Sequence, residues 1–384
     1  MRLLKDLNVR DKKVLVRVDF NVPLLNGKIE DDYRLSTAIP TIKYLVEQNS
    51  RIILISHLGR PDGKIVDSLR LKPVALRLQE LLGMPVGYVD DCIGEKAAAA
   101  VAALQPGQLL LLENLRFYPG EEANDEEFAS QLASLAECYV NDAFSAAHRA
   151  HASTFAVAKL LPSAAGFLME KEVNSLSLIT SNPEHPFVII LGGAKVSDKI
   201  GVIDNLLDRA DRLLVGGGMA FTFLKAKGIS TGKSLVEPDR LGYAAQLLAR
   251  AGDKIVLPLD IVVSPSLQSD DEVQLVPADK IPEHLMGLDI GPETIAVFAR
   301  EIKLARSIFW NGPVGAFEYP GFAAGTMAIR SAVVDNPGIT VIGGGDTAAA
   351  VADCLDKFTH VSTGGGASLE FLEGRVLPGV AALR

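Results

Sequence analysis

The chain has 384 residues, of which 48% are hydrophobic and 22% are charged. This composition is typical of folded globular proteins and excludes disordered and collagen-like chains. The 38 basic and 47 acidic residues give a net charge of −9, which argues against a general nucleic-acid or membrane binder but allows a local basic pocket. At roughly 150 residues per domain, the length predicts two domains or three.

Three features predict a cytoplasmic protein. Cys92, Cys138 and Cys354 lie far apart without a C-x-x-C spacing, so we expect reduced thiols. Residues 1–13 are charged and lack the apolar core of a signal peptide. No apolar run approaches the roughly 20 residues that a membrane helix needs.

Short apolar runs alternate with helical patterns through the first half of the chain. Apolar, often β-branched runs predict strands over 14–20, 51–56, 109–114 and 138–144. Apolar residues at helical spacing predict helices over 34–48 and 125–137, and acidic residues in the first turn favour the latter.

The second half repeats this alternation. The predicted strands are 187–191, 212–216, 254–263, 307–312, 339–344 and 360–365. The predicted helices begin near Ser197, Met219, Asp239, Pro292, Phe322 and Asp346. Near-continuous apolar strands separated by helices indicate an α/β fold, with parallel sheets covered by helices on both faces.

A single parallel sheet of ten or more strands would be unusual, so we expect two lobes. The best boundary lies within 160–176, which proline and glycine interrupt before a helical pattern that could bridge the lobes. This divides the chain into 1–166 and 167–366. The tail 367–384 is too short to form a layer of its own, and we expect it to pack back on the first lobe.

Glycine-rich turns follow the strands of the second lobe. They occur at 191–195, 215–220, 310–315, 342–347 and 362–367. Glycine lets the backbone approach a ligand, and a helix that starts directly afterwards points free N–H groups and a positive dipole end at it. One such turn could serve only to reverse the chain. Five in one lobe, together with Lys195 and Lys199, indicate a polyphosphate site.

Two nucleotide-binding patterns can be tested against these turns. Gly228–Ser234 resembles a P-loop but is one residue too short and follows a helical segment. Gly343–Ala348 fits the relaxed dinucleotide pattern G-x-G-x-x-A, which leaves a nicotinamide-dependent oxidoreductase as an alternative. The ribose-binding acid expected about 20 residues later is absent, however. Asp346 would repel a bare pyrophosphate, and it makes sense there if Mg²⁺ lies between them.

Basic residues follow the strands of the first lobe. Five of them occupy loop positions expected to share one rim: Arg34, His57, Arg60, Arg116 and Arg149. Singly, each could be a solvated surface charge. Together they would repel one another unless an anion binds there, and the planar guanidinium group suits phosphate and carboxylate. The first lobe is therefore expected to bind a small, highly anionic substrate.

Other polar and sulfur-containing residues carry weaker signals. His148 and His151 lack a third ligand, so we expect no zinc site. Cys138 and Cys354 are expected to be inert, and Trp310 to belong to the core. Glu318 could bind ribose hydroxyls or simply be solvated.

Ten motifs, in this order, resemble the phosphoglycerate kinase family of bacterial type. They are VDFNVP, SHLGRP, ENLRF, AHRAHAS, GGAKVSDK, GGGMAFTF, MGLDIGP, WNGPVGAFE, GGGDT and STGGGASLEFL, between about residues 14 and 372. The resemblance implies two Rossmann-like α/β/α lobes joined by a hinge helix. It also implies reversible phosphoryl transfer between 1,3-bisphosphoglycerate and ADP, in line and after the lobes close, giving 3-phosphoglycerate and ATP.

The resemblance further implies roles for individual residues. The triose substrate would bind Asp19, Phe20, Asn21, Arg34, His57, Leu58, Gly59, Arg60, Arg116 and Arg149. The nucleotide would bind Gly193, Ala194, Lys195, Lys199, Gly217, Gly218, Leu288, Asn311, Glu318, Gly344, Gly345, Asp346 and Thr347. Arg34, Lys195 and Lys199 would act on the transferred group, and Asp346 would lie on the Mg²⁺ side.

Mg²⁺ and ATP or ADP are thus the implied cofactor and co-substrate, and a monomer without nucleic-acid or membrane partners is the expected form. A sugar-phosphate-binding protein without catalysis is the non-enzymatic alternative. The presence of both Arg34 and Lys195 argues against it.

Overall fold

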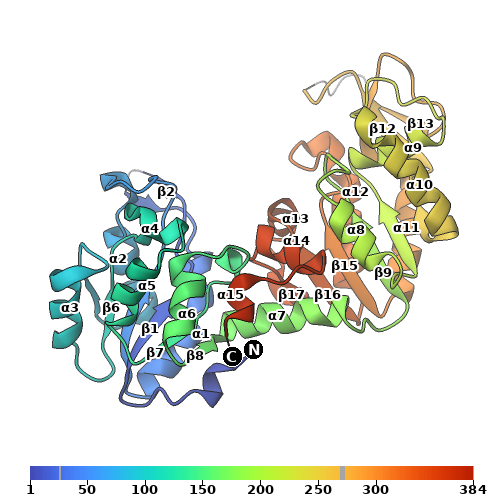
Figure 1. Ribbon diagram of the computed structural model, residues 1–384. Coiled ribbons are helices and arrows are strands. Elements are labelled where there is room, and N and C mark those ends of the chain that lie inside the picture. Colours follow the sequence, from blue (N-terminus) through green and yellow to red (C-terminus); the bar gives the residue numbers. More distant parts are fainter. Residues whose placement is uncertain (26, 269–272, 384) are drawn as a thin grey trace. The chain divides into compact units, whose positions relative to one another are not determined.

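The computed structural model describes residues 1–25, 27–268 and 273–383 (Figure 1). The chain forms two compact units. Unit 1 consists of Met1–Val173 and Val376–Arg384, and unit 2 of Asn174–Arg375. The division therefore falls within helix α7 (Phe167–Thr180) and after Arg375, whereas the sequence placed it at 166/167 and 366/367.

Unit 1 is built on a six-stranded parallel sheet, with the order β5-β6-β4-β1-β7-β8. In that order the strands are Val86–Tyr88, Leu109–Leu111, Arg51–Ile55, Lys13–Arg17, Cys138–Asn141 and Ser163–Ala165. The longer helices of this unit are α1 (Tyr33–Glu47), α2 (Lys72–Leu82), α3 (Gly94–Ala103) and α5 (Glu126–Ala133). The shorter helices α4 (Pro119–Glu122) and α6 (Val157–Leu160) pack beside α5.

Unit 2 contains a second six-stranded parallel sheet, with the order β11-β10-β9-β15-β16-β17. Its strands are Ile255–Val256, Arg212–Val215, Phe187–Leu191, Ser307–Asn311, Ile339–Gly343 and His360–Val361. Its helices are α8 (Ile200–Leu206), α9 (Met219–Ala226), α10 (Leu241–Ala251), α11 (Pro292–Leu304), α12 (Ala324–Val334), α13 (Gly345–Ala350) and α14 (Gly366–Leu372). The two parallel sheets confirm the predicted α/β fold.

A three-stranded antiparallel sheet in unit 2 was not predicted. It has the order β13-β12-β14, with strands Gln274–Pro277, Asp260–Ser264 and Met286–Ile290. The single strand expected over 254–263 is wrong, because the chain leaves the parallel sheet after Val256 and enters the antiparallel one at Asp260. Pro258 lies between them and has no N–H to continue a ladder.

The central strands of both parallel sheets are apolar and buried. Ile52, Leu54, Val14, Val16 and Val140 pack in the core of unit 1. Trp310 is fully buried in the core of unit 2, as expected. None of the described helices is long and apolar enough to cross a membrane.

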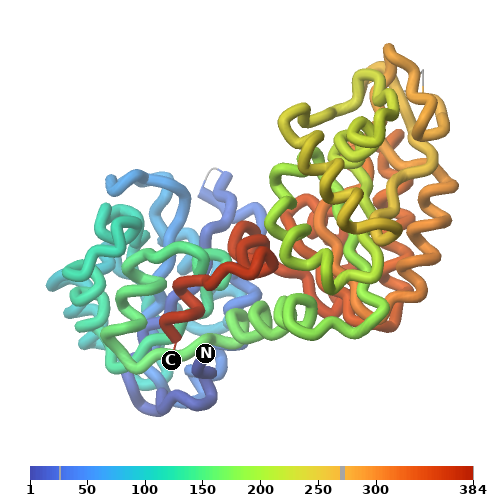
Figure 2. The backbone as a smooth tube through the Cα atoms, turned by 45° about the vertical axis from the view of Figure 1, so that its right-hand side comes forward, coloured from blue at the N-terminus to red at the C-terminus, as the bar shows by residue number. Residues whose placement is uncertain are grey.

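The end of the chain belongs to unit 1. Helix α15 (Pro378–Ala381) follows α14, and the Gly379 N–H donates to the carbonyl of Ala147 at 2.8 Å. The Arg2 N–H donates to the carbonyl of Leu383 at 3.1 Å, so the two ends of the chain lie side by side (Figure 2). Helix α14 instead packs against α8 in unit 2. Arg384, the last residue of the predicted tail, lies outside the described residues.

Candidate functional site

Asp19 organises the loop that follows β1. Its carboxylate is nearly buried and accepts hydrogen bonds from Arg34 of α1, from the Ser145 hydroxyl and from the Asn21 N–H. The Asn21 side chain in turn accepts from the Gly59 N–H at 2.9 Å. The loops after β1 and β4 and the first turn of α1 are thereby joined, as expected for neighbouring strands whose carboxyl ends lie at one edge of the sheet.

The side chain of Asn114 holds the loop after β4 through hydrogen bonds to its backbone. The Leu58 N–H donates to Asn114 Oδ1 at 3.1 Å, and Asn114 Nδ2 donates to the Leu58 carbonyl at 2.7 Å. Gly59 has φ +64°, and a Cβ there would approach Leu69 to 2.7 Å, so this position requires glycine. Phe20 is fully buried and donates its N–H to Ser56 Oγ at 2.9 Å. Phe20 and Leu58 thus support the loop with side chains in the core.

Four of the five predicted basic residues interact electrostatically in the structure: Arg34, His57, Arg116 and Arg149. Arg116 is 6% exposed, donates to the Gly59 carbonyl at 2.8 Å and pairs with Glu122 at 3.0 Å. Burial lowers its pKa, and the neighbouring cations, Arg149 among them, act in the same direction. Burial also lowers the pKa of His57 well below its usual value, and Arg116 and Arg34 reinforce the shift. These groups therefore lie close enough to repel one another, which favours an anionic ligand.

Arg149 and Arg60 are the more exposed residues of the predicted rim, and the buried His151 lies near Arg116 and Arg149. Arg149 donates through Nε to His148 Nε2 at 3.1 Å. Burial lowers the pKa of His151 to about 4, and Arg116 adds to the effect. Arg60 is exposed beside Gly59 and forms no ion pair with any described residue, so its head group is available to a ligand.

A pocket of about 460 Å³ lies within unit 2. Seven predicted nucleotide-binding residues line it: Gly193, Ala194, Gly217, Gly218, Leu288, Glu318 and Asp346. One wall comes from the unpredicted antiparallel sheet, through Ile261 of β12 and Met286 of β14. Phe221, Leu235 and Val314 add further apolar surface. A mostly apolar slot with a few polar groups at its margin suits a purine ring.

Close backbone packing explains the glycines of this pocket. Gly217 has φ +62°, and a Cβ there would lie 2.7 Å from the Gly193 nitrogen. The Gly193 N–H donates to the Pro313 carbonyl at 2.8 Å, and the Gly217 N–H donates to the Val314 carbonyl at 2.8 Å. The turns after β9, β10 and β15 are therefore joined backbone to backbone, with no room for a side chain at Gly217.

The turn after β16 lies beside Asn311. Gly344 has φ +89°, and a Cβ added at this residue would lie 3.0 Å from Asn311 Nδ2. Thr347 Oγ1 accepts from the Gly312 N–H at 2.7 Å. Lys199 donates through Nζ to Asn311 Oδ1, and burial lowers its pKa although nearby Asp346 acts in the opposite direction. A lysine and an amide thus lie next to a helix N-terminus, a combination that favours phosphate.

Two predicted residues lie at the margin of this cluster. Lys195 is exposed in the turn after β9, and Gly345 is exposed at the first position of α13. Neither residue lines the pocket. Each could therefore contact only the phosphate end of a nucleotide, outside the apolar slot.

A comparison with known proteins decides the family. The family model described as phosphoglycerate kinase matches residues 4–375. The chain belongs to the phosphoglycerate kinase family. The phosphoglycerate kinase of Moorella thermoacetica is 56% identical over 99% of this chain and 98% of its own length. The phosphoglycerate kinase of Rubrobacter xylanophilus is 55% identical over 100% of this chain and 98% of its own length.

Solved structures agree with this assignment. The phosphoglycerate kinase structure from Coxiella burnetii matches with a TM-score of 0.93 and 42% identity, covering 100% of this chain and 99% of that one. The phosphoglycerate kinase structure from Pyrococcus horikoshii matches with a TM-score of 0.86 and 34% identity. The match covers 100% of this chain and 98% of that one. The predicted family, the α/β fold and the phosphotransferase activity of a phosphoglycerate kinase (EC 2.7.2.3) are confirmed.

The Mg²⁺ expected in a phosphoglycerate kinase fits the residues of unit 2 only if the protein and the phosphates of a nucleotide hold the ion together. Among the described residues, no group of three or more histidine, cysteine or carboxylate side chains could hold a metal. Asp346 is an exposed carboxylate at the start of α13, next to Lys199. One carboxylate with the phosphates of a nucleotide is a usual setting for Mg²⁺, which would neutralise phosphate charge there.

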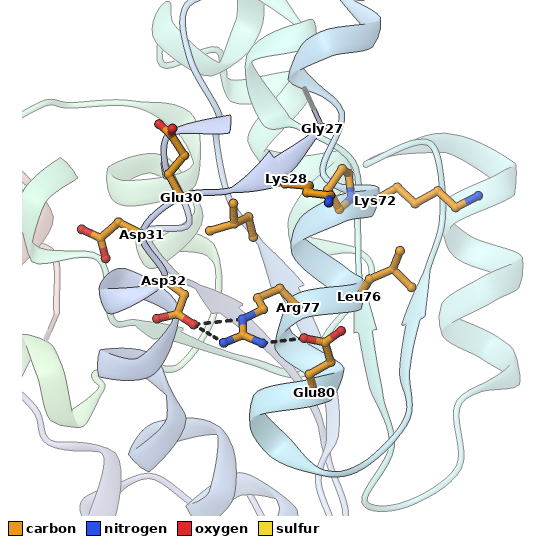
Figure 3. Close-up of a pocket in the computed structure, with 11 residues that line it drawn as sticks. Gly27, Lys28, Glu30, Asp31, Asp32, Lys72, Leu76, Arg77 and Glu80 are labelled. Carbon is orange, nitrogen blue, oxygen red and sulfur yellow. Dashed lines mark hydrogen bonds and ion pairs between the residues drawn. The ribbon is translucent and has the colours of Figure 1, made fainter. Parts of the chain in front are cut away.

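A second cavity, of about 720 Å³, lies between the β2–β3 hairpin (Leu24–Leu25 and Lys28–Ile29) and helix α2 in unit 1 (Figure 3). Arg77 at its floor donates to Asp32 at 2.6 and 2.9 Å and to Glu80 at 2.5 Å. Its guanidinium group is therefore neutralised by the protein itself, and we assign no ligand to this cavity.

Sequence reasoning missed the polar residues behind the rim. Arg17 is 1% exposed in β1, and Glu121 is fully buried in α4. An arginine inside an apolar strand pattern was the available signal in the sequence.

Proposed function

We propose that this chain transfers a phosphoryl group reversibly between the acyl phosphate of 1,3-bisphosphoglycerate and ADP. Unit 1 would hold the triose and unit 2 the Mg-nucleotide. The observation that carries the proposal is the convergence of Arg34, His57 and Arg116 on one rim, with Arg149 close by. A net-acidic protein that gathers Arg34, Arg116 and Arg149 around His57 in this way favours a substrate with both phosphate and carboxylate groups.

On unit 1, we assign the hydroxyl and carboxylate end of the triose to Asp19 and Asn21, with the backbone around Phe20, Leu58 and Gly59 shaping the floor. The basic rim takes the anionic groups. Arg34 is 36% exposed while paired with the nearly buried Asp19, so part of its head group can meet a ligand while the pair stays intact.

On unit 2, we assign the purine to the apolar slot near Leu288 and the ribose to Glu318 at its margin. The phosphates would meet Lys199, Asn311, Thr347 and the backbone of 344–346. Support comes from the buried N–H of Asn311, which lacks a partner among the described residues and lies beside Gly344. Mg²⁺, held partly by Asp346, is part of this proposal.

The chemistry requires little covalent participation by the protein. The attacking carboxylate of 3-phosphoglycerate is ionised at neutral pH, so no general base is needed. Arg34 and Lys195 would stabilise charge on the transferred oxygens, and alignment supplies much of the remaining rate enhancement. Transfer in line requires the two substrates to meet, and we propose that the units close to bring this about. X-ray scattering with and without both substrates tests closure.

A direct assay tests the function. Purified protein is mixed with MgATP and 3-phosphoglycerate, and ADP release is measured. Activity that depends on both compounds is expected, whereas no ADP above that of an Arg34→Ala control would contradict the proposal. Sedimentation at assay concentration tests the proposed monomer, and fractionation of the source cells tests the proposed cytoplasmic location.

A further inference from the structure

A buried arginine lies directly behind the histidine of the basic rim. Arg17 ends strand β1 and is 1% exposed. Its guanidinium donates through Nε to Ser153 Oγ at 2.9 Å and through a second nitrogen to the Val18 carbonyl. A third nitrogen lies 3.0 Å from His57 Nδ1. Arg17 is therefore fixed on three sides and has no freedom to turn toward solvent.

A buried carboxylate anchors this arginine from the other side. Glu121 Oε1 accepts from the Ser153 hydroxyl at 2.6 Å, and Oε2 accepts from the Ser153 N–H at 2.9 Å. The Ser153 hydroxyl thus accepts a hydrogen bond from Arg17 and donates one to Glu121. Burial raises the pKa of Glu121, and the positive charge of Arg17 opposes that rise. The result is a continuous hydrogen-bonded series, Glu121–Ser153–Arg17–His57, which we call the buried relay.

The buried relay determines which nitrogen of His57 carries the proton. Arginine has only donors, so a hydrogen bond between Arg17 and His57 requires a lone pair on Nδ1. Nδ1 must then be unprotonated, and the proton of the neutral ring must lie on Nε2. The rival partner is Asp19, whose Oδ1 would favour a proton on Nδ1. It lies 4.0 Å away, beyond hydrogen-bond distance, while Arg17 lies at 3.0 Å.

The surroundings also keep the ring uncharged. His57 is 7% exposed. It faces Arg17 from β1, Arg34 from α1, Arg116 from the loop after β6 and His151 from the loop after β7, against the single carboxylate of Asp19. Nε2 has no hydrogen-bond partner among the described residues, so its N–H is left for a ligand.

We propose that Arg17, Ser153 and Glu121 are positioning residues that hold His57 as the neutral Nε2–H tautomer, so that the imidazole meets the anionic substrate as a hydrogen-bond donor and not as a cation. The proposal rests on the proposed function only in taking 3-phosphoglycerate as that substrate. The arginines then supply the positive charge of the rim, and His57 supplies one hydrogen bond of fixed direction to the substrate.

Nitrogen NMR of the histidine side chains tests the tautomer in the unaltered protein. The chain has six histidines, and the His57 signals are those lost in His57→Gln. Between pH 6 and 8 without ligand, we expect the Nε2–H pattern throughout. The Nδ1–H tautomer, or a doubly protonated ring, would overturn the inference. Adding 3-phosphoglycerate should shift the Nε2–H signal. The expected tautomer without any such shift would instead contradict the substrate role of His57, and so the proposed function.

Substitutions test whether the relay acts through His57. In Glu121→Gln, KM for 3-phosphoglycerate should rise roughly tenfold, with kcat and KM for MgATP within about twofold. Arg17→Met should mix the two tautomers of His57, and Arg17→Lys, which restores a donor, should return part of the Nε2–H pattern. Arg330→Met removes a more exposed arginine, paired with Asp353 at 2.7 Å in unit 2, and should change neither the tautomer nor KM. Unaltered tautomer and KM in folded Glu121→Gln would refute the relay.

Discussion

The ammonium group of Lys199 donates a hydrogen bond to Oδ1 of Asn311, and the amide nitrogen of the same asparagine stays buried without a partner among the described residues. A buried donor without a partner is costly in a folded protein. It lies beside Gly344, at the turn where the phosphates are expected. The pair therefore presents a fixed cation and a free N–H to one anionic group.

This arrangement predicts a selective defect in Asn311→Asp. The new side chain keeps an oxygen for Lys199 but replaces the free N–H with an anionic oxygen, which repels phosphate. KM for MgATP should rise about tenfold or more, with KM for 3-phosphoglycerate within about twofold. Asn205→Asp, at an amide that donates to the Leu372 carbonyl elsewhere in unit 2, is the matched control and should leave both constants unchanged. Equal increases in both constants for Asn311→Asp would argue against a phosphate contact.

Arg34→Ala should abolish most activity without unfolding the protein. Its side chain is partly exposed in the first turn of α1, so its loss leaves no cavity in the core. We expect kcat to fall by about two to three orders of magnitude, because charge on the transferred group loses a stabilising partner. Circular dichroism verifies the fold, and Arg330→Ala serves as the control. A kcat within tenfold of the parent would remove Arg34 from the proposed mechanism.

Most strands of the parallel sheets could be predicted because they are continuous apolar runs, whereas β5 (VGY) and β8 (SAA) are not such runs and were missed. The same property explains why Arg17 was overlooked: it occupies a strand position within VLVRVDF, and only the folded chain brings Ser153 and His57 to it. The rim was predictable because loops at the carboxyl ends of neighbouring parallel strands must meet at one edge. Arg116 and His57 illustrate this, although their burial was not foreseen.

The apolar wall of the nucleotide pocket was harder to predict for a different reason. Ile261 and Met286 come from β12 and β14 of the antiparallel sheet. Their pairing depends on contacts between distant segments, and it interrupts a run that looks like one strand. The glycine turns were visible in the sequence because positive φ and close backbone approach, as at Gly217 and Gly344, leave few alternatives to glycine.

Asp346→Ala should weaken binding of the Mg-nucleotide and spare the triose. The carboxylate is exposed at the pocket margin, so its removal costs the fold little. We expect Kd for MgADP to rise roughly tenfold, equivalent to about 1.4 kcal/mol, and Kd for 3-phosphoglycerate to stay the same. Calorimetry measures both ligands separately. Asp353→Ala, at another exposed carboxylate of unit 2, is the control, and equal losses for both ligands would contradict the assignment.

Asp289 predicts a dependence of stability on pH. Its carboxylate is 3% exposed and accepts from the Ile290 N–H at 2.9 Å and the Gly325 N–H at 2.7 Å. Burial raises its pKa from 3.8 to about 7. The folded state therefore holds the proton more tightly than the unfolded chain. This contribution to the free energy of unfolding is complete below about pH 4 and is lost as the pH rises through 7.

The single tryptophan makes this dependence measurable. Trp310 is fully buried in unit 2, which also contains Asp289, so its fluorescence follows unfolding of that unit in urea. Relative to Asp289→Asn, the parent protein should lose stability between pH 5 and 8, by about 3 kcal/mol, because two pKa units separate pH 5 from the folded pKa of about 7. Asp142 has a pKa raised to about 6 by burial in unit 1, and it is present in both proteins, so it cancels in the comparison. Parallel curves for the two proteins over this range would show that Asp289 is ionised throughout, and that its two backbone hydrogen bonds outweigh the cost of burying its charge.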